Sequence, residues 1–515
     1  MKHKLLIIII VLIGVSSCKK EFLTLLPPTQ LTSGSFYTNL TQFQQAVTAS
    51  YVPLKTIVNT GIFQDEMRSD NTFFTIYQAN RGFEKIHEAY SQFTDVSNSA
   101  SIPNSPGDRW TGDYSGISRI NTILGQLATA TFLSQGAKDS ISGEISFLRA
   151  FYYFDLATHF GGVPLLLAPV NSAEGSYTPR NTLEEVYTQI KADLAKAIPL
   201  LPAVTAFPQS GKASKGAAKM LLAYVYMTQP AKDYAKAESE LLDITKMSYS
   251  LLPIYADVFD PNNKNSRESI FEVQYLSDLV SSLQSNFTWQ FIPKSTNSEI
   301  IAGYHDGAMS ILSGWNVPTA EMVSSYEAND ARLPASVLVV EGKISGVEDF
   351  TITGAKSPVG YTPTAGITPM YMIKKYFHPP YTISFNTPDD WPVFRYSGAL
   401  LLLAECLVNE NKTAEALPYL NQVRRRAGLP DVAAATADNV ANETRHELAF
   451  ENHRWTDLLR TGKAISTLNA KGVRLKAIYG WILPAAFNVT ADKLIYPVPF
   501  REVQINNKLT QNPGY

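Results

Sequence analysis

Two stretches of the chain follow the same plan: LLAYVYMTQPAKDYAKAESELLDITK (221–246) and LLAECLVNENKTAEALPYLNQVR (402–424). Each has an apolar segment with helical spacing, a polar turn, and a second helical segment. Small residues stand at matching places in the two stretches, namely Ala223 and Ala237 in the first and Ala404 and Ala416 in the second. Small residues let paired helices approach closely, as in tetratricopeptide (TPR) repeats. The pattern predicts two TPR-like helical hairpins.

Other segments also have helical signals. Thr41 and Gln44 have capping-box spacing, and so do Thr182 and Glu185, whose helix should stop before Pro199. Apolar residues recur at helical spacing over 144–160, where Gly161 should end the helix. We therefore predict an all-α fold, a TPR-like superhelix with long irregular loops and minor β segments.

The segment 255–395 has a different character. It contains a strand-like piece, SIFEVQY (269–275), among loops rich in Gly, Pro, Asn and Ser. Long irregular segments on a rigid frame are where binding residues usually lie. We expect ligand-facing loops here.

The composition narrows the class of function. The formal net charge is only −2, so nothing favours nucleic acid as a partner. Aromatic residues make up 11% of the chain and charged residues only 17%. Some of these aromatic faces should form the core and others a binding surface.

The first residues predict export. Lys2 and Lys4 precede an apolar run, Leu5–Val15, that would rise about 16 Å as a helix, too short for a bilayer core of about 30 Å. This is the pattern of a signal peptide, residues 1–17. Cys18 then stands where VSSC resembles a bacterial lipoprotein cleavage site, so we expect lipidation at Cys18 and a tether over 18–40.

The remaining chain divides into a helical region, 41–250, and a C-terminal region with loops and helices, 251–515. The other cysteine, Cys406, should be a buried apolar residue, and a lone thiol excludes a disulfide framework or a cysteine zinc site.

Catalytic motifs are missing from the sequence. In HELAFENH (446–453) the two histidines are seven residues apart, about 10 Å along a helix, too far to share one zinc ion. No Walker loop, dinucleotide fingerprint or nucleophile elbow is present. We expect a protein that is not an enzyme and has no cofactor and no metal.

Five blocks together resemble the SusD/RagB family of surface nutrient-binding lipoproteins. They are EISFLRAFYYFDLATHFGGVPLL (144–166), RYSGALLLLAECL (395–407), YLNQVRRRAGLP (419–430), RHELAFENHRWTDLLRTG (445–462) and PVPFREVQINNKLTQNPGY (497–515). Two positions depart from the family pattern: His446 stands where a second arginine is common, and Asn452 where glycine is usual.

The resemblance implies a TPR-like superhelix anchored by lipid in the outer membrane and exposed at the cell surface. It also implies a partner, a SusC-like TonB-dependent transporter, to which captured oligosaccharide or polysaccharide is passed. Capture of peptides is an alternative within the family. A TPR scaffold without a small ligand is a further alternative.

The family blocks themselves suit structural roles. Glu451, Arg454 and Asp457 fall three apart, on one side of a helix with Leu448 and Trp455, and suit a partly buried ionic network. We expect Arg149 and Arg395 to have structural roles as well. Four tryptophans in or beside these blocks should belong to the core: Trp110, Trp391, Trp455 and Trp481.

A saccharide site needs exposed aromatic faces beside polar groups. The best candidate is DEMRSDNTFFTIYQANR (65–81), which contains Asp70, Asn71, Phe73, Phe74, Tyr77 and Arg81. In an extended stretch Phe73 and Phe74 would face opposite ways. The irregular middle adds three further candidates, Trp289, Tyr304 and Trp315.

Overall fold

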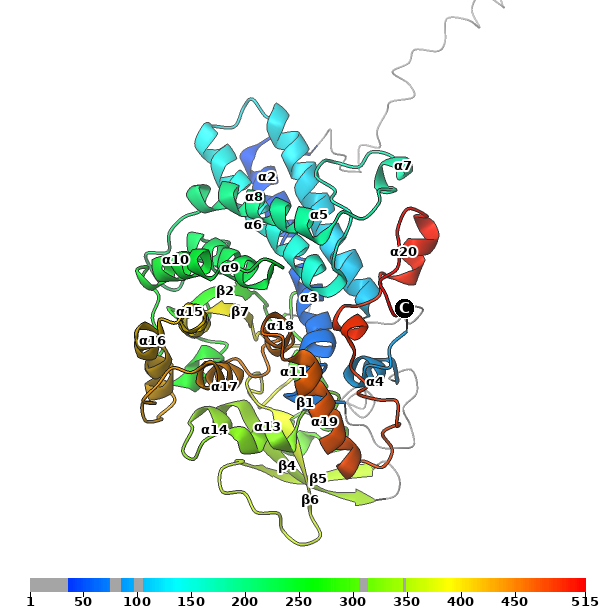
Figure 1. Ribbon diagram of the computed structural model, residues 1–515, viewed down its shortest axis with the longest axis vertical. Coiled ribbons are helices and arrows are strands. Elements are labelled where there is room, and N and C mark those ends of the chain that lie inside the picture. Colours follow the sequence, from blue (N-terminus) through cyan, green and yellow to red (C-terminus); the bar gives the residue numbers. More distant parts are fainter. Residues whose placement is uncertain are drawn as a thin grey trace, which may run out of the picture.

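The computed structural model describes residues 36–74, 85–96, 105–278, 280, 282–295, 297–304, 314–345 and 349–515. The architecture is a helical frame with three small sheets, which confirms the predicted all-α, TPR-like superhelix with minor β segments (Figure 1). Cys18 of the predicted anchor lies outside the described residues. No helix among the described residues is both long and apolar enough to cross a membrane.

The first group of helices forms one end of the body (Figure 1). It comprises α2 (Leu40–Ala49), α3 (Leu54–Gly61), α5 (Pro106–Thr129), α6 (Gln135–Phe160) and α8 (Leu183–Leu200). The short helix α7 (Ala173–Ser176) lies beside it (Figure 1), whereas α4 (Lys85–Gln92) packs against the π-helical turn Ile62–Glu66.

The caps of these helices test the sequence signals. The Thr182–Glu185 capping box is present, and Gly161, with a φ of 77°, ends α6 as predicted. The predicted cap at Thr41 is wrong, because the Asn39 side chain accepts from the Gln42 N–H and starts α2 earlier. The predicted stop before Pro199 is also wrong: α8 continues to Leu200, because a proline in the last turn removes only one hydrogen bond.

The two predicted helical hairpins are confirmed. The first is α9 (Lys215–Thr228) with α10 (Tyr234–Thr245), and the second is α15 (Tyr396–Asn409) with α16 (Thr413–Arg426). The matching small residues are all completely buried between helices: Ala223, Ala237, Ala404 and Ala416. Cys406 is also completely buried, as predicted. Because α10 packs against α15, the hairpins form one continuous frame.

The irregular middle contains most of the β structure. Strand β2 (Ser269–Val273), predicted from SIFEVQY, pairs antiparallel with β7 (Trp391–Arg395). A second sheet, which the sequence analysis did not locate, has the order β5 (Asp349–Lys356), β4 (Val337–Ser345), β6 (Thr368–Ile373). The third is a short ribbon of β1 (Thr72–Phe73) and β3 (Val317–Pro318).

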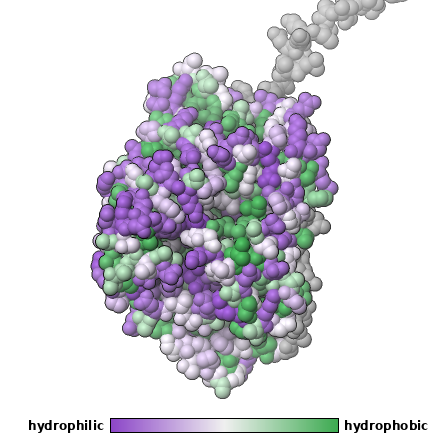
Figure 2. All heavy atoms as spheres, viewed as in Figure 1, coloured by the Kyte–Doolittle hydropathy of each residue, from purple (hydrophilic) through white to green (hydrophobic). Residues whose placement is uncertain are grey.

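Short helices connect these strands and complete the C-terminal part. The connecting helices are α11 (Phe287–Phe291), α12 (Glu299–Ala302), α13 (Ala320–Ser325) and α14 (Arg332–Ser336). The C-terminal helices are α17 (Ala437–Glu447), α18 (Arg454–Arg460), α19 (Ala464–Ile478) and α20 (Phe500–Ile505). Figure 2 shows this face of the molecule covered mainly by hydrophilic residues, with apolar residues gathered right of its centre.

The predicted single helix over 445–462 is interrupted. Helix α17 ends at Glu447 and α18 begins at Arg454, because Phe450 and Asn452 between them adopt φ values of 66° and 64°. A left-handed backbone explains why glycine is usual at this position, and asparagine tolerates it better than most residues. The break points Glu451 towards Arg395, away from Arg454.

The expected ionic network is therefore present with different partners. Glu447 accepts from Arg332 at 3.3 Å and from Arg395 at 3.0 Å, and it also pairs with Arg426. Glu451 pairs with Arg395 at 2.7 Å. Burial alone would raise the pKa of Glu447, but the three arginines hold it well below its usual range. We call these five residues the Glu447 hub.

The other expected structural residues are also found in the interior. Arg149 pairs with Asp193 at 2.6 Å. Trp110, Trp391 and Trp455 are buried, and Trp481 packs half-buried against the smaller of the two apolar clusters. The core prediction is thus confirmed for the first three and holds in part for Trp481.

Candidate ligand-binding site

The β1–β3 ribbon joins two segments that the sequence analysis proposed separately. Its register pairs Thr72 with Pro318 and Phe73 with Val317. The end of β1 and the start of β3 are therefore neighbours, although they lie more than 240 residues apart in the chain. Candidate residues from 65–81 and from the irregular middle meet at this point.

Trp315, just before β3, lies in an aromatic group. Its ring packs on Phe63 at 5.7 Å and on His87 at 5.6 Å between centroids, and these two rings stack on each other at 4.2 Å. Phe63 lies in a π-helical turn, Ile62–Glu66, a rare conformation that often marks functional sites.

Helix α11 brings Trp289, another candidate of the irregular middle, into the same neighbourhood. The backbone carbonyl of Gln290 accepts a hydrogen bond from the backbone N–H of Trp315 at 3.1 Å. The neighbouring Trp289 packs on Tyr381 at 4.9 Å, and the Tyr381 N–H donates to the Ala302 carbonyl, two residues before Tyr304. We call Phe63, His87, Trp289 and Trp315 together the aromatic junction, whereas Tyr304 packs partly buried against the main apolar cluster.

The junction is more closed than the sequence predicts. Trp289 is 1% exposed and Trp315 is 7% exposed, so the expectation of exposed loop tryptophans is wrong for both. The reason is that their rings complete aromatic packing that loop composition does not reveal. Tyr304 is half-buried. The indole N–H groups of Trp289 and Trp315 nevertheless have no hydrogen-bond partner among the described residues.

Phe73 and Phe74 are also buried, at 4% and 2% exposure, so neither offers an exposed face. They do face opposite ways, as predicted. Phe73 belongs to the smaller apolar cluster with Trp455, and Phe74 belongs to the main cluster. Both rings hold the ribbon against the body.

Asp70 and Asn71 are engaged inside the protein. Asp70 accepts from Arg454 at 2.7 Å and from Arg445 at 3.2 Å. Burial alone would raise the pKa of Asp70, but the two arginines hold it far below its usual range. Asn71 donates to Glu66 at 2.9 Å and accepts from Arg445. The expectation that these groups are free for a ligand is therefore wrong.

Lys471, which no sequence signal indicated, also holds the segment 67–72 in place. Its ammonium donates to the carbonyls of Thr72 at 2.7 Å and Met67 at 3.3 Å and also to that of Ser69. A buried lysine four hundred residues away in the chain leaves no local signal in the sequence. Two further predicted residues, Tyr77 and Arg81, lie outside the described residues.

Other chemistry at the site is limited. Within the described ranges, no group of three or more His, Cys, Asp or Glu side chains is arranged to hold a metal ion. His446 and His453 have different partners, Ser325 at 2.9 Å and Tyr224 at 3.5 Å. The groups at the junction that remain without a partner among the described residues are the two buried indole N–H donors.

Comparisons with known families match nearly the whole chain. A family described as "SusD family" matches residues 267–515, and one described as "Starch-binding associating with outer membrane" matches residues 21–227. A SusD-like protein from Formosa agariphila is 25% identical over 100% of this chain and 99% of its own length. The starch-binding protein SusD from Bacteroides thetaiotaomicron is 24% identical over 83% of this chain and 82% of its own length.

Solved structures share the fold. A laminarin-binding SusD-like protein superimposes with a TM-score of 0.73 at 25% identity, covering 92% of this chain and 99% of its own. Surface glycan-binding protein A from Bacteroides thetaiotaomicron gives 0.73 at 21% identity, covering 93% and 100%.

Proposed function

We propose that this chain, which belongs to the SusD/RagB family, is a cell-surface glycan-binding lipoprotein. It captures oligosaccharide or polysaccharide at the aromatic junction and passes it to a SusC-like TonB-dependent transporter. The observation that carries this proposal is the junction itself. Two tryptophans predicted to bind, Trp289 on α11 and Trp315 just before β3, lie close together in the chain's backbone network, because the Gln290 carbonyl accepts from the backbone N–H of Trp315. Both keep indole donors without a partner among the described residues.

The chemistry of the junction suits a sugar. Sugars present apolar C–H faces between hydroxyl groups, so aromatic edges and unpaired N–H donors complement them. Buried polar groups are normally paired, and an unpaired buried donor needs an explanation such as a functional role. The fold-sharing protein that binds laminarin favours a glycan over a peptide as the ligand.

A binding screen tests the proposal. The mature chain, purified without its lipid, should be retarded in native gels that contain laminarin, starch or other polysaccharides, and a panel of peptides should not compete. Retardation by at least one glycan supports the proposal. Binding of peptides with no glycan binding would favour the peptide-capture alternative. Transporter contact without any small ligand would favour a scaffold.

The anchor is tested separately. We expect Cys18→Ala to release the protein from the membrane fraction, because the lipid chains supply about 0.8 kcal/mol of anchoring free energy for each buried CH2. The measurement is fractionation of cells that lack the transporter, with the unmodified protein as the control. Full membrane retention of the variant would contradict lipidation at this cysteine.

A further inference from the structure

A cavity lies between α5, the segment 164–177 and α20. We call it the α5–α20 groove. Figure 1 shows α5, α7 and α20 together in the upper half of the view, whereas β1 lies in the lower half. The groove is therefore separate from the aromatic junction. Its volume is about 860 Å³, with the open solvent at its mouth included. Six of the lining residues carry the argument: Trp110, Tyr114, Ser115, Tyr177, Glu502 and Ile505.

The inner wall of the groove is held rigid by the core. Trp110 is 4% exposed and packs edge-on against Phe160 at 5.2 Å. Tyr114 lies 5.0 Å from Trp110, and its hydroxyl donates to the Pro164 carbonyl at 2.8 Å. These contacts fix the half-buried Tyr114 ring before any ligand arrives, which lowers the entropy cost of binding.

The outer wall has polar groups that nothing in the described chain satisfies. The Ser115 hydroxyl, the Tyr177 hydroxyl and the Glu502 carboxylate form no hydrogen bond or ion pair with any described residue. Glu502 nevertheless lies close enough to Tyr114 to help raise its pKa, although burial is the larger cause. An unpaired carboxylate beside aromatic rings and two hydroxyl groups makes a mixed apolar and polar lining.

We propose that the α5–α20 groove is a second saccharide subsite, selective for neutral sugars. The Tyr114 and Tyr177 rings and Ile505 supply apolar faces, while Ser115 and Glu502 supply hydrogen-bond partners for hydroxyl groups. The unpaired Glu502 carboxylate repels uronates and sulfated sugars, and Arg180, whose charge also reaches Tyr114, offsets part of that repulsion. This inference rests on the proposed glycan-binding function.

Two subsites on one molecule have a consequence for long ligands. A polysaccharide that reaches both the junction and the groove gains affinity through effective concentration, whereas a short oligosaccharide occupies one site at a time. Loss of the groove should therefore weaken binding of the polymer more than binding of the oligomer.

Variants of groups without a partner test the inference with little risk to folding. Tyr177→Ala with Glu502→Gln should lower the affinity for laminarin about tenfold and leave the affinity for laminarihexaose at the junction within about twofold. The matched control is Tyr419→Ala with Glu415→Gln on α16, on the opposite side of the view in Figure 1. Thermal melts check that both double variants fold.

A charged probe sharpens the test. At low ionic strength, carboxymethylated laminarin should bind the parent more weakly than laminarin does, and Glu502→Gln alone should narrow that difference. Equal laminarin affinity of the groove variant and the control would overturn the subsite. If the parent binds no glycan at all, the proposed function fails as well, so the two failures are distinguishable.

Discussion

The Glu447 hub and the aromatic junction both bury groups that often face solvent, but they differ in how completely those groups are paired. In the hub, Glu447 meets three arginines, and Glu451 meets Arg395 and Lys375. In the junction, the indole donors of Trp289 and Trp315 have no partner among the described residues. The two hub carboxylates are fully paired, which suits a structural role even though the Arg426 Nε has no partner among the described residues, whereas the unpaired indole donors are available to a ligand.

The largest effect is expected in the hub. Glu447→Ala removes the shared partner of three buried arginines, so it should lower the free energy of unfolding by up to about 5 kcal/mol. Denaturant unfolding measures this. The control is Asp431→Ala, which breaks an exposed pair with Arg425 and should cost less than about 1 kcal/mol. Similar losses in both variants would show that the hub is not a special structural cluster.

The second largest effect is expected at Trp455, which lies in the apolar cluster that the β1–β3 ribbon joins. Trp455 is 1% exposed and shares its apolar cluster with Phe73 and Val317, the paired residues of β1 and β3. Trp455→Ala should therefore cost about 3 to 4 kcal/mol of unfolding free energy. A variant with full thermal stability but lost glycan binding would show that Trp455 belongs to the site instead of the core.

These two regions also show what sequence reasoning can reach. Helical spacing and paired alanines predicted the hairpins because that pattern is local. The burial of Trp315 by Phe63 and His87, and the attachment of 67–72 by Lys471, depend on contacts between distant parts of the chain. Aromatic and polar composition indicated 65–81 and the irregular middle as candidate binding segments, but it could not tell a stacked core ring from an exposed one.

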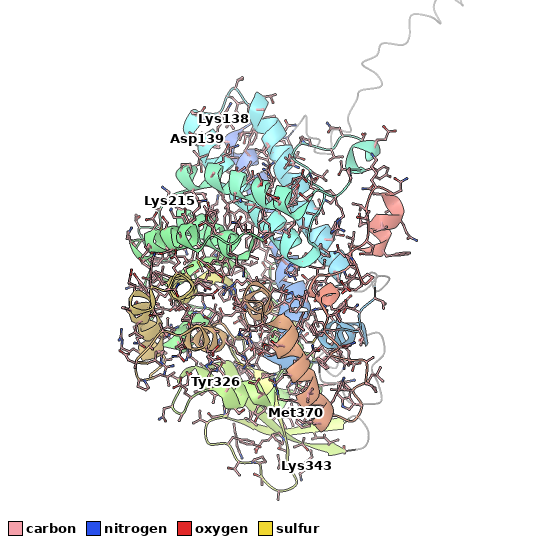
Figure 3. The ribbon with its side chains drawn as sticks, in the orientation of Figure 1. Lys138, Asp139, Lys215, Tyr326, Lys343 and Met370 are labelled. Carbon is pink, nitrogen blue, oxygen red and sulfur yellow. The ribbon has the colours of Figure 1, made fainter. Side chains whose placement is uncertain are left out.

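The stability of the folded protein should also depend on pH through His446, the residue before Glu447 in the chain. His446 stacks on Tyr326 with 4.5 Å between the ring centroids, and Figure 3 labels Tyr326 in the lower half of the body. Burial, followed by the nearby arginines, lowers the pKa of His446 to about 3. Below pH 6.5 the unfolded chain binds a proton that the folded protein does not, so stability falls between pH 6.5 and about 3.

At pH 5 the titration of His446 should lower the free energy of unfolding by about 2 kcal/mol relative to pH 7. His446→Gln should lack that component, so its unfolding free energy should decline less steeply with acid. Urea unfolding of both proteins at several pH values measures the difference, because the other titrating groups are common to the two. Parallel curves would mean that His446 is protonated in the folded protein.

The smallest effect concerns the junction itself. Trp315→Phe keeps a ring against Phe63 and His87 but removes the indole N–H. If that donor binds a sugar, the affinity for glycan should fall about tenfold, which corresponds to about 1.4 kcal/mol. The unfolding free energy should change by less than about 1.5 kcal/mol.

Trp455→Phe is the matched control, because its indole N–H also lacks a partner among the described residues but lies in the core. Titration calorimetry with laminarin, or with the glycan that the screen identifies, should show a loss for Trp315→Phe only. Equal affinities for the two variants would mean that an unpaired indole at the junction has no more to do with the ligand than one in the core. The functional contrast between the hub and the junction would then have no support from the indole donors.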